Sequence, residues 1–465
     1  MAVGAAHVSA LHQFADTSTS LGPSDVLDAL LGFDDLYRIA ASVPRRQPGT
    51  VGRPRAYPAE VALLYCAMAP EYGSHLRAAA EFRNPRIWEH IRARMLSMAG
   101  IDLPTRPPSR NQLNYGRKEL IRHEPGLADT FRFCAIAQAQ RMGLLNPNIP
   151  ISLTSPARGQ FITGDGKVIA SPVLRVTATK WTNNAASTFT MVPWKDHKQG
   201  GDEGGQWVYG TKFFQLSARP DSRRNIRVIL DSRHVPPSGH GGEIGVAMES
   251  ARRLLRTIEN GCVHGLTYDG AATGVHLNEL MKRGLLCVVP TPKNVATKAL
   301  HRIACRCGRS HDLWTEHGQI SLRRIDDSGA AHLLPLTAKL TRHANKDGTW
   351  RWYAVLNLPC GNTHRERIDT TPKDTTRGFN RAHQIRQAAI RTTHGTTLKE
   401  SVYGWRSDSE SGNRVTQNHL KNRQVAGYSA ESTTLLMLCM AITRNAIAHA
   451  VFEQSHPPPG QPLAA

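Results

Sequence analysis

The sequence predicts a multidomain α/β protein in which a mixed sheet follows a helical region and is interrupted by a β-rich insertion. The 465 residues are too many for one typical domain. Apolar residues recur at helical spacing before residue 150 and at strand spacing after it, and alternating runs return within 293–400. The predicted segments are a helical region, the first part of the core, the insertion, the C-terminal core helices and a disordered tail, at 1–148, 149–292, 293–400, 401–453 and 454–465.

The composition indicates a folded, basic chain. Hydrophobic residues make up 40%, which excludes a wholly disordered protein. The net charge of +21 favours a polyanionic partner, most simply nucleic acid, although an arginine-rich enzyme would show the same balance. Eight cysteines do not make a disulfide framework in a chain this long, so we expect reduced thiols and a cytoplasmic location. No run of 18 apolar residues and no signal peptide is apparent, so no membrane segment is expected.

The first region reads as a series of helices. After a weakly ordered lead-in, Ser24 is expected to cap the first helix, and residues 45–58 form a basic arm. Further helices are expected from Pro58, after Ser74, from Asn84-Pro85, after Ser109 and over 127–142. The helix, glycine-containing turn and helix within this series fit a helix-turn-helix, and they fit a small helical bundle equally well. The candidate DNA contacts are Arg45, Arg46, Arg53, Arg55, Arg110, Arg117 and Lys118.

The core and insertion follow in order. Strands are expected at 161–165, 167–170, 173–181, 207–216, 226–230, 263–269 and 285–290, with helices at 243–259 and 275–283 and a loop at 199–205. The insertion shows strands at 319–325, 332–340 and 349–358 and a polar, loop-like end at 361–400. Residues 402–452 return to a helical pattern.

Asp165 and Asp269 share one sequence context. Each ends a short apolar run and is followed by glycine. An acid at the carboxyl end of a strand projects into the crevice where α/β proteins bind ligands, and the glycine allows a tight exit or the close approach of a ligand. Two carboxylates on neighbouring strands would suit Mg²⁺ or Mn²⁺.

Tyr403, Arg406, Glu410 and Gln417 fall on one face if their segment is a helix. An ordinary solvated face with an Arg406–Glu410 pair would explain this stripe. The strongly apolar turns that follow favour a buried region instead, and Gly404 and Gly412 suggest that something approaches the backbone closely.

The order of strand-Asp165, strand-Asp269 and helix-Glu410 resembles the DDE transposases of bacterial insertion sequences. Tyr403, Arg406 and Glu410 match the Tyr-x2-Arg-x3-Glu signature of one subgroup, while Gln417 stands where related proteins commonly have lysine. Two segments are similar in sequence to transposases common in actinobacteria: YDGAATGVHLNELMKRG (268–284) and YGWRSDSESGN (403–413). The resemblance covers roughly residues 150–450.

The resemblance implies an RNase H-like catalytic core and metal-dependent DNA cleavage and strand transfer. Asp165 would bridge two Mg²⁺ or Mn²⁺ ions, Asp269 would bind one and Glu410 the other, while Tyr403, Arg406 and Gln417 would contact DNA. Transposon ends and target DNA would be the substrates, bound by a homodimer. A metal-dependent nuclease without transposition and an inactive DNA-binding relative are the alternatives.

Other polar residues have less specific contexts. Asp231 also ends a strand, but no glycine follows it; Asp408 lies off the face of Glu410; and Glu243 suits a helix N-terminus. Cys305, Cys307 and His311, with Cys360 and His364 beyond, could bind zinc, but Cys-x-Cys is a tight spacing and reduced loop thiols are the favoured interpretation. In the insertion, Trp314, Trp350 and Trp352 could stack on DNA bases, although alternating tryptophans such as Trp350 and Trp352 more often form core.

Overall fold

The computed structural model describes residues 21–44, 56–171, 187–193, 205–223, 225–237, 241–290, 296–368, 376–390, 398–420 and 429–456. Contacts divide the chain into two compact units. The first unit comprises Met1–Leu144, Asp165–Ile258 and Ser409–Ala465, and the second comprises Leu145–Gly164 and Glu259–Asp408. Each unit is therefore built from segments that are distant in the sequence.

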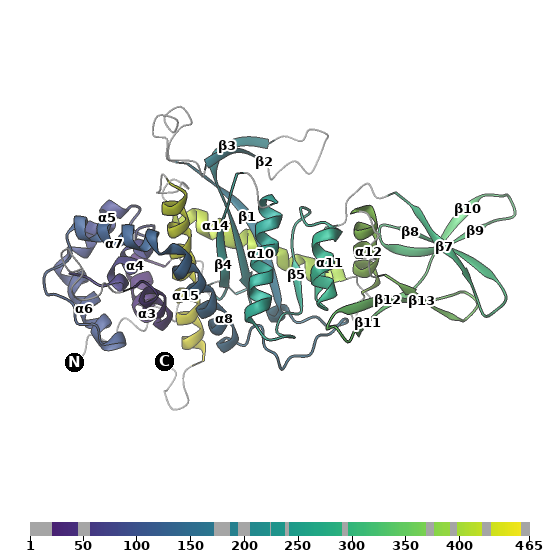
Figure 1. Ribbon diagram of the computed structural model, residues 1–465, viewed down its shortest axis with the longest axis horizontal. Helices are drawn as coiled ribbons and strands as arrows, with labels where there is room; N and C mark the ends of the chain where they lie inside the picture. Colours follow the sequence, from purple (N-terminus) through teal and green to yellow (C-terminus); the bar gives the residue numbers. More distant parts are fainter. Residues whose placement is uncertain are drawn as a thin grey trace. The chain divides into compact units, whose positions relative to one another are not determined.

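A mixed sheet confirms the predicted α/β class (Figure 1). Its strand order is β2-β3-β1-β5-β6, and β4 pairs with β3 beside this path. β1 pairs with β5, and β5 with β6, in parallel; β3 pairs with both β2 and β4 in antiparallel fashion. The strands are β1 (Phe161–Ala170), β2 (Ser187–Pro193), β3 (Gly205–Ala218), β4 (Val228–Val235), β5 (Gly265–Thr267) and β6 (Leu286–Val288).

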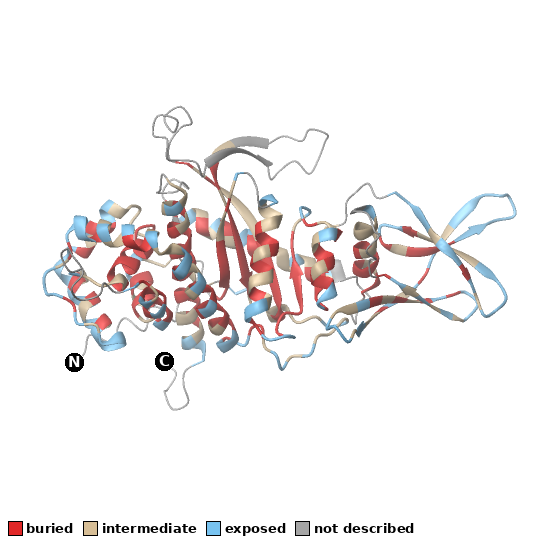
Figure 2. Cartoon of the chain, in the orientation of Figure 1, coloured by how far each residue is buried: buried red, intermediate tan, exposed pale blue. Residues whose placement is uncertain are grey.

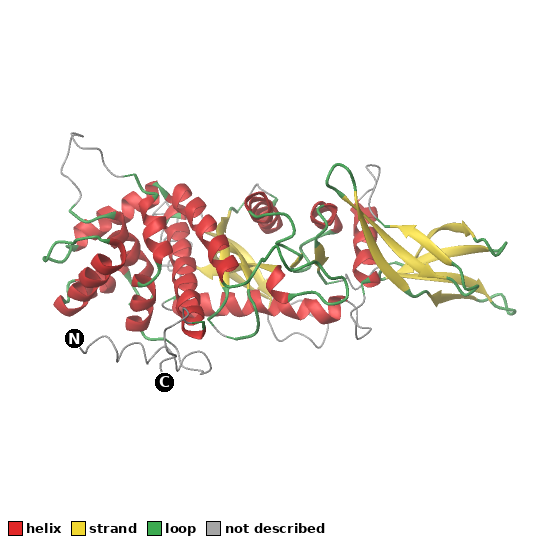
Figure 3. Cartoon of the chain, turned by 90° about the horizontal axis from the view of Figure 1, so that it is seen from below, coloured by secondary structure: helices red, strands yellow, loops and turns green. Residues whose placement is uncertain are grey.

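Many helices of the first unit lie close together, at the left of Figure 3, and α15 contacts α2, α4, α7, α8 and β4. Asn445 on α15 joins this helix to β4, because its side chain accepts from the N–H of Ile229 at 2.8 Å and donates to the carbonyl of Ile229 at 2.9 Å. The helices are α2 (Pro23–Leu31), α3 (Asp34–Ala41), α4 (Ala59–Met68), α5 (His75–Phe82), α6 (Pro85–Ala99), α7 (Arg110–Arg122), α8 (Glu124–Arg141), α10 (Gly242–Thr257), α15 (Ala430–Ser455) and, mostly within this unit, α14 (Ser407–His419).

α15 is long and apolar enough to cross a membrane, yet 78% of its most apolar window is buried inside the structure. Its neighbours within the first unit account for this burial, so it has the character of a core helix. One such helix is weak support for a membrane protein.

Local capping explains most of the predicted helix starts. The side chains of Ser74, Asn84 and Ser109 each accept a hydrogen bond from a backbone N–H in the first turn, as expected. The predicted cap at Ser24 is wrong: α2 begins at Pro23, and the side chain of Asp25 accepts the N–H of Gly22 at 2.9 Å. The proline at the first helical position sets this start two residues earlier than a cap at Ser24 would.

The second unit carries α11 (Gly274–Lys282) next to β5 and β6, and then the insertion. One antiparallel sheet has the order β10-β9-β8-β7, and the other has the order β11-β12-β13. α12 contacts β9, β11 and β12. The elements are η1 (Arg158–Gln160), β7 (Lys298–Ala304), β8 (Ser310–Glu316), β9 (Gln319–Ile325), β10 (Ala331–Pro335), β11 (Ala338–Ala344), β12 (Trp350–Asn357), β13 (Thr363–Arg367), α12 (Thr376–Ala389), α13 (Leu398–Val402) and η2 (Tyr403–Arg406).

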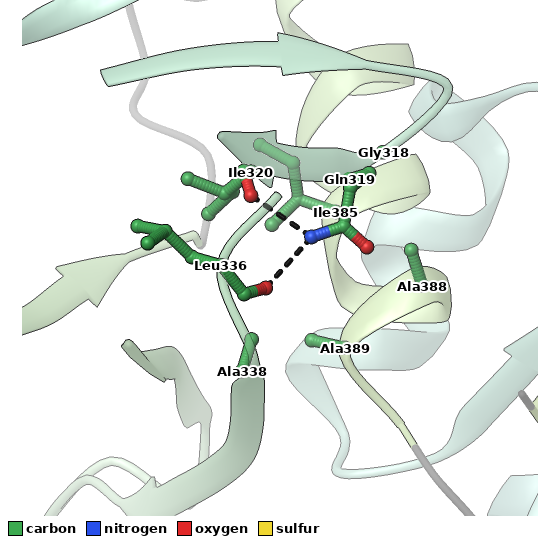
Figure 4. A pocket seen from close by; sticks show the side chains of 8 residues that line it. All are labelled: Gly318, Gln319, Ile320, Leu336, Ala338, Ile385, Ala388 and Ala389. Atoms are coloured by element: carbon green, nitrogen blue, oxygen red, sulfur yellow. Dashed lines mark hydrogen bonds between the residues drawn. The ribbon is translucent and has the colours of Figure 1, made fainter. Parts of the chain in front are cut away.

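The insertion is buried near α12 and exposed along the far ends of its strands (Figure 2). A small cavity of about 10 Å³ lies between α12 and the strands, lined by residues that include Ile320, Leu336 and Ile385 (Figure 4). The side-chain amide of Gln319 closes it by donating to the carbonyls of Ile320 at 2.9 Å and Leu336 at 2.7 Å. Because the space holds about one water molecule, it is a packing void and not a ligand site.

Three sequence-based boundaries are corrected. β1 runs without a break through Asp165, so the predicted strands 161–165 and 167–170 are one strand. The predicted strand 332–340 is divided between β10 and β11. Residues 361–400 are predicted to be loop-like, but part of this segment forms α12. One side of this helix packs on the sheets, and its basic and polar residues cover the other side. The predicted strand at 173–181 and most of the predicted loop at 199–205 lie outside the described residues.

Candidate functional site

Asp165 and Glu243 form a pair of acids in the first unit. Asp165 lies in the middle of β1, and Glu243 lies in the first turn of α10. Each offers a carboxylate oxygen, and these oxygens are within 4.8 Å of one another. Both residues are partly buried, which holds their side chains more firmly than full exposure would. The pair could therefore hold a divalent metal ion through hard oxygen ligands.

Gly166 makes room for this pair. A Cβ atom at this position would lie 2.1 Å from the carboxyl carbon of Glu243. The glycine after Asp165 thus admits a neighbouring carboxylate, and the expectation that it lets the chain leave the strand is wrong, because β1 continues to Ala170. The sequence predicts only that Glu243 lies at a helix N-terminus, and this is confirmed by its position in the first turn of α10. The sequence shows an acid directly after Gly241-Gly242, but nothing in its spacing connects it with Asp165.

Two further side chains fix the acids. The side-chain amide of Asn413 donates to Oδ2 of Asp165 at 2.7 Å. The Nζ of Lys212, on β3, lies 2.6 Å from Oε2 of Glu243. These contacts orient both carboxylates, as neighbouring hydrogen bonds do for metal ligands in general.

Asp269 lies just beyond the end of β5, the strand that pairs with β1. Thr163 of β1 is paired with Thr267 of β5, and the two strands are parallel. Asp165 lies two residues after Thr163, still within β1, and Asp269 lies two residues after Thr267, the last residue of β5. The Oδ1 of Asp269 accepts the N–H of Ala271 at 2.9 Å, which stabilises the turn that follows β5. The prediction that each acid ends its strand is therefore corrected: Asp269 lies two residues after the end of β5, and Asp165 lies inside β1.

Glu410 lies on the exposed side of α14, one turn before Asn413. Asn413 is 7% exposed and contacts Asp165, so the two residues differ in burial although they are only three positions apart on the helix. On the next position, the hydroxyl of Ser411 accepts a hydrogen bond from Arg227 at 2.7 Å. A Cβ at Gly412 would lie 2.4 Å from the Arg227 guanidinium, which identifies the close approach predicted for this glycine.

Tyr403 and Arg406 lie on η2 and not on a continuous α-helix with Glu410. The predicted single helix is therefore corrected: a 3-10 turn leads into α14 at Ser407. Because residues three apart eclipse in a 3-10 helix, Tyr403 and Arg406 still share one side, and the guanidinium carbon of Arg406 is 6.0 Å from the centre of the Tyr403 ring. Gln417 is half-buried on α14. A Cβ at Gly404 would meet no atom of the described residues within 4 Å, so the close approach suggested there is not found.

Asp231 and Asp408 make structural contacts. Asp231 is 2% exposed on β4, and its Oδ1 lies 3.5 Å from the Nε of Arg132 on α8. Asp408 is 4% exposed, and its Oδ2 accepts hydrogen bonds from two nitrogens of Arg158, one of them Nε at 3.2 Å. Each acid therefore neutralises an arginine within its own unit.

The described basic candidates of the N-terminal region lie on α7. Arg110 and Lys118 are exposed, and Tyr115 between them is 50% exposed. Arg117 is half-buried and donates from Nη2 to the hydroxyl of Ser432 on α15 at 3.1 Å. Arg110 and Lys118 therefore face the solvent, whereas Arg117 supports the packing of α7 on α15. Arg45, Arg46, Arg53 and Arg55 lie outside the described residues.

The second unit gathers a different set of metal-binding side chains. Cys305, Cys307, His311 and Cys360 each offer a ligand atom, all within 4.8 Å of one another. The pKa of the Cys305 thiol is lowered to about 6, because the backbone N–H of Cys307 and the side chain of Asn362 stabilise its thiolate by hydrogen bonds. The thiolate is the metal-binding form of cysteine. The sequence favours reduced thiols in loops. The thiols do lie in turns, but together with His311 they form a group that could bind a metal ion.

The tryptophans of the insertion contact arginines. Trp352 is fully buried and Trp350 is half-buried, with the guanidinium of Arg342 lying 5.7 Å and 4.2 Å from their respective ring centres. Core packing therefore accounts for this pair, as expected. Trp314 on β8 lies 5.2 Å from the guanidinium of Arg323.

A scan against protein-family models and searches of curated proteins and of solved structures find no match to this chain.

Proposed function

We propose that this protein is a DDE-type transposase with an RNase H-like core, which binds transposon ends and catalyses metal-dependent DNA cleavage and strand transfer. The observation that carries the proposal is that Asp165 lies on β1 and that Asp269 follows, by two residues, the end of β5, the strand that pairs with β1 in parallel. The contact of Asn413 with Asp165, one turn after Glu410, adds support for the third acid. The mixed sheet with α10 and α11 between its later strands is compatible with the RNase H-like fold.

The donor set fits hard divalent cations. Asp165, Asp269 and Glu410 would hold Mg²⁺ or Mn²⁺, and Glu243 is a further candidate ligand because it lies beside Asp165. Such ions, when bound, would activate an attacking oxygen and stabilise a leaving oxygen at phosphorus. Asn413 and Lys212 would position the carboxylates, as they do in the structure.

The remaining residues would bind DNA. Arg406 can grip a phosphate through two nitrogens, and Tyr403 can donate a hydrogen bond to the same group. The exposed cations of α7 would contact the duplex backbone, and a homodimer would bring two transposon ends together. These assignments agree with the basic composition, because phosphate contacts require lysine and arginine.

The test uses the full-length chain with DNA that carries the inverted repeats flanking its gene, a second duplex as target, and Mg²⁺. We expect cleavage at the repeat ends and joining of the cut 3′ ends to the target. Asp165→Asn, Asp269→Asn and Glu410→Gln should each abolish cleavage while retaining binding in a gel-shift assay. Asp102→Asn, at an exposed position in the N-terminal region, is the matched control and should behave like the wild type.

Other results of this cleavage and joining assay would contradict part of the proposal. Cleavage without joining would identify a nuclease of the same chemistry, and binding without cleavage would identify an inactive relative. Normal cleavage by Asp165→Asn would exclude the proposed metal site. If Glu243→Gln abolishes cleavage and Glu410→Gln does not, the third acid is Glu243.

A further inference from the structure

The three cysteines and one histidine of the insertion connect its two sheets. Cys305 and Cys307 belong to the turn between β7 and β8, and His311 lies on β8. Cys360 belongs to the turn between β12 and β13, in the other sheet. The four ligand atoms are within 4.8 Å of one another, although Cys360 lies 49 or more positions after the others in the sequence.

Both turns are built in the same way. Cys307 and Cys360 are each followed by a glycine with positive φ, at +79° and +81° respectively. The N–H of Gly308 donates to the carbonyl of Cys305 at 3.0 Å, and the N–H of Gly361 donates to the carbonyl of Leu358 at 3.0 Å. Glycine suits these positions because other residues are strained at such φ values. Each tight turn therefore presents cysteine at the tip of a hairpin.

The side chains around Cys305, Cys307, His311 and Cys360 suit a bound cation. The side-chain amide of Asn362 lies 3.3 Å from the sulfur of Cys305 and 3.7 Å from that of Cys360. The Nε2 of His311 is shielded from solvent and makes no hydrogen bond within the described part of the chain. A shielded polar atom without a partner costs free energy, and coordination of a metal by this nitrogen would remove that cost.

We propose that Cys305, Cys307, His311 and Cys360 bind one structural Zn²⁺ ion that fastens the two insertion sheets together. Three cysteines and one histidine form a recognised tetrahedral zinc ligand set, and four protein ligands leave no open position for catalysis. The site is separate from the proposed carboxylate site and does not depend on the proposed function.

A disulfide explains the group less well. The sulfurs of Cys305 and Cys360 are 3.5 Å apart, whereas a disulfide bond is about 2.05 Å long. A disulfide would also use only two of the four converging side chains and would leave a third thiol beside it. None of the cysteines in the described residues forms a disulfide.

A neighbouring group provides the matched control. His301 on β7 and His364 on β13 each place Nε2 3.2 Å from Oε2 of Glu366. These residues also have donor atoms close enough for a metal ion, but the shared carboxylate already accounts for both histidines. His364, one of the zinc ligands considered from sequence, belongs to this group.

The first experiment measures zinc in the full-length chain, expressed with added zinc and purified under reducing conditions. Mass spectrometry of the metal content should give about one zinc per chain. Cys360→Ser and His311→Ala should lose this zinc, whereas His301→Ala should retain it. Loss of zinc from His301→Ala, with retention by Cys360→Ser, would assign the ion to the neighbouring group and overturn the proposal.

The second experiment keeps the proposal testable if the variants fail to fold. The wild-type chain is stripped of metal with a chelator and titrated with Co²⁺. We expect thiolate-to-cobalt charge-transfer bands and the strong visible bands of tetrahedral cobalt, saturating at one ion per chain and displaced by Zn²⁺. A wild-type chain with no bound zinc and no thiolate–cobalt bands would overturn the proposal. An intact mass lower by two hydrogens, with Cys305 and Cys360 linked in a peptide map, would also overturn it.

Discussion

Asn413 on α14 donates a hydrogen bond from its side-chain amide to Oδ2 of Asp165 on β1, at 2.7 Å. The contact joins residues 248 positions apart in the sequence. Asn413 is 7% exposed, so water does not readily replace it as a partner for the carboxylate. The bond fixes the orientation of Asp165 from the helix that also carries Glu410.

Asn413→Ala should therefore weaken metal-dependent cleavage while leaving the chain folded. Removing a group that orients a metal ligand typically costs about 10- to 100-fold in metal affinity or activity. The measurement is the Mg²⁺ dependence of cleavage, which should shift to higher concentration. Asn418→Ala, at an exposed position of the same helix, should leave it unchanged. Equal Mg²⁺ dependence for Asn413→Ala and wild type would show that Asp165 needs no such support.

Gly166→Ala tests the pairing of Asp165 with Glu243. The new methyl group would lie 2.1 Å from the Glu243 carboxyl carbon, so that flexible side chain must move away. We expect a small change in melting temperature and a clear loss of Mg²⁺ or Mn²⁺ binding, measured by calorimetric titration. Gly126→Ala is the control, because a Cβ there would meet no described atom within 4 Å. If Gly166→Ala binds the metal like the wild type, Glu243 is not part of the site.

The sequence predicts the elements of this fold better than their connections. Local signals suffice for Ser109, which caps its helix in the structure as the capping pattern indicates. They also suffice for the strand Gln319–Ile325, whose alternation is visible in the sequence. The contact of Gly166 with Glu243 depends instead on how α10 packs on the sheet, and no local pattern encodes it. The same holds for Cys360, whose sulfur lies 3.5 Å from that of Cys305 although the two residues are 55 positions apart in the sequence.

The cations of α7 give a third prediction. Arg110→Ala and Lys118→Ala should each lower the slope of log K against log salt for binding to transposon-end DNA by about 0.9, because each removes one phosphate contact. Arg117→Ala should leave the slope unchanged and lower the melting temperature, since Arg117 donates to Ser432 on α15. The slopes come from fluorescence anisotropy at several salt concentrations. Wild-type slopes for both Arg110→Ala and Lys118→Ala would exclude α7 as a DNA-binding surface.

Arg406→Lys tests whether the η2 turn positions a DNA phosphate. Lysine keeps the positive charge but lacks the planar fork that grips a phosphate through two nitrogens. If the fork sets the position of the scissile phosphate, a misplacement of about 1 Å should slow cleavage on the order of 100-fold. The melting temperature should stay close to that of the wild type, because Arg406 is only partly buried and lysine fits the same space.

Arg414→Lys is the matched control, because it makes the same arginine-to-lysine change at an exposed position of α14. This variant should cleave normally. Single-turnover cleavage and thermal unfolding are measured on both variants. Slow cleavage with unchanged melting in Arg406→Lys alone would support the phosphate role, because an ion-pairing role survives replacement by lysine. Unchanged cleavage in Arg406→Lys would reject that role and leave Arg406 with its stacking contact to Tyr403, where the guanidinium carbon is 6.0 Å from the ring centre.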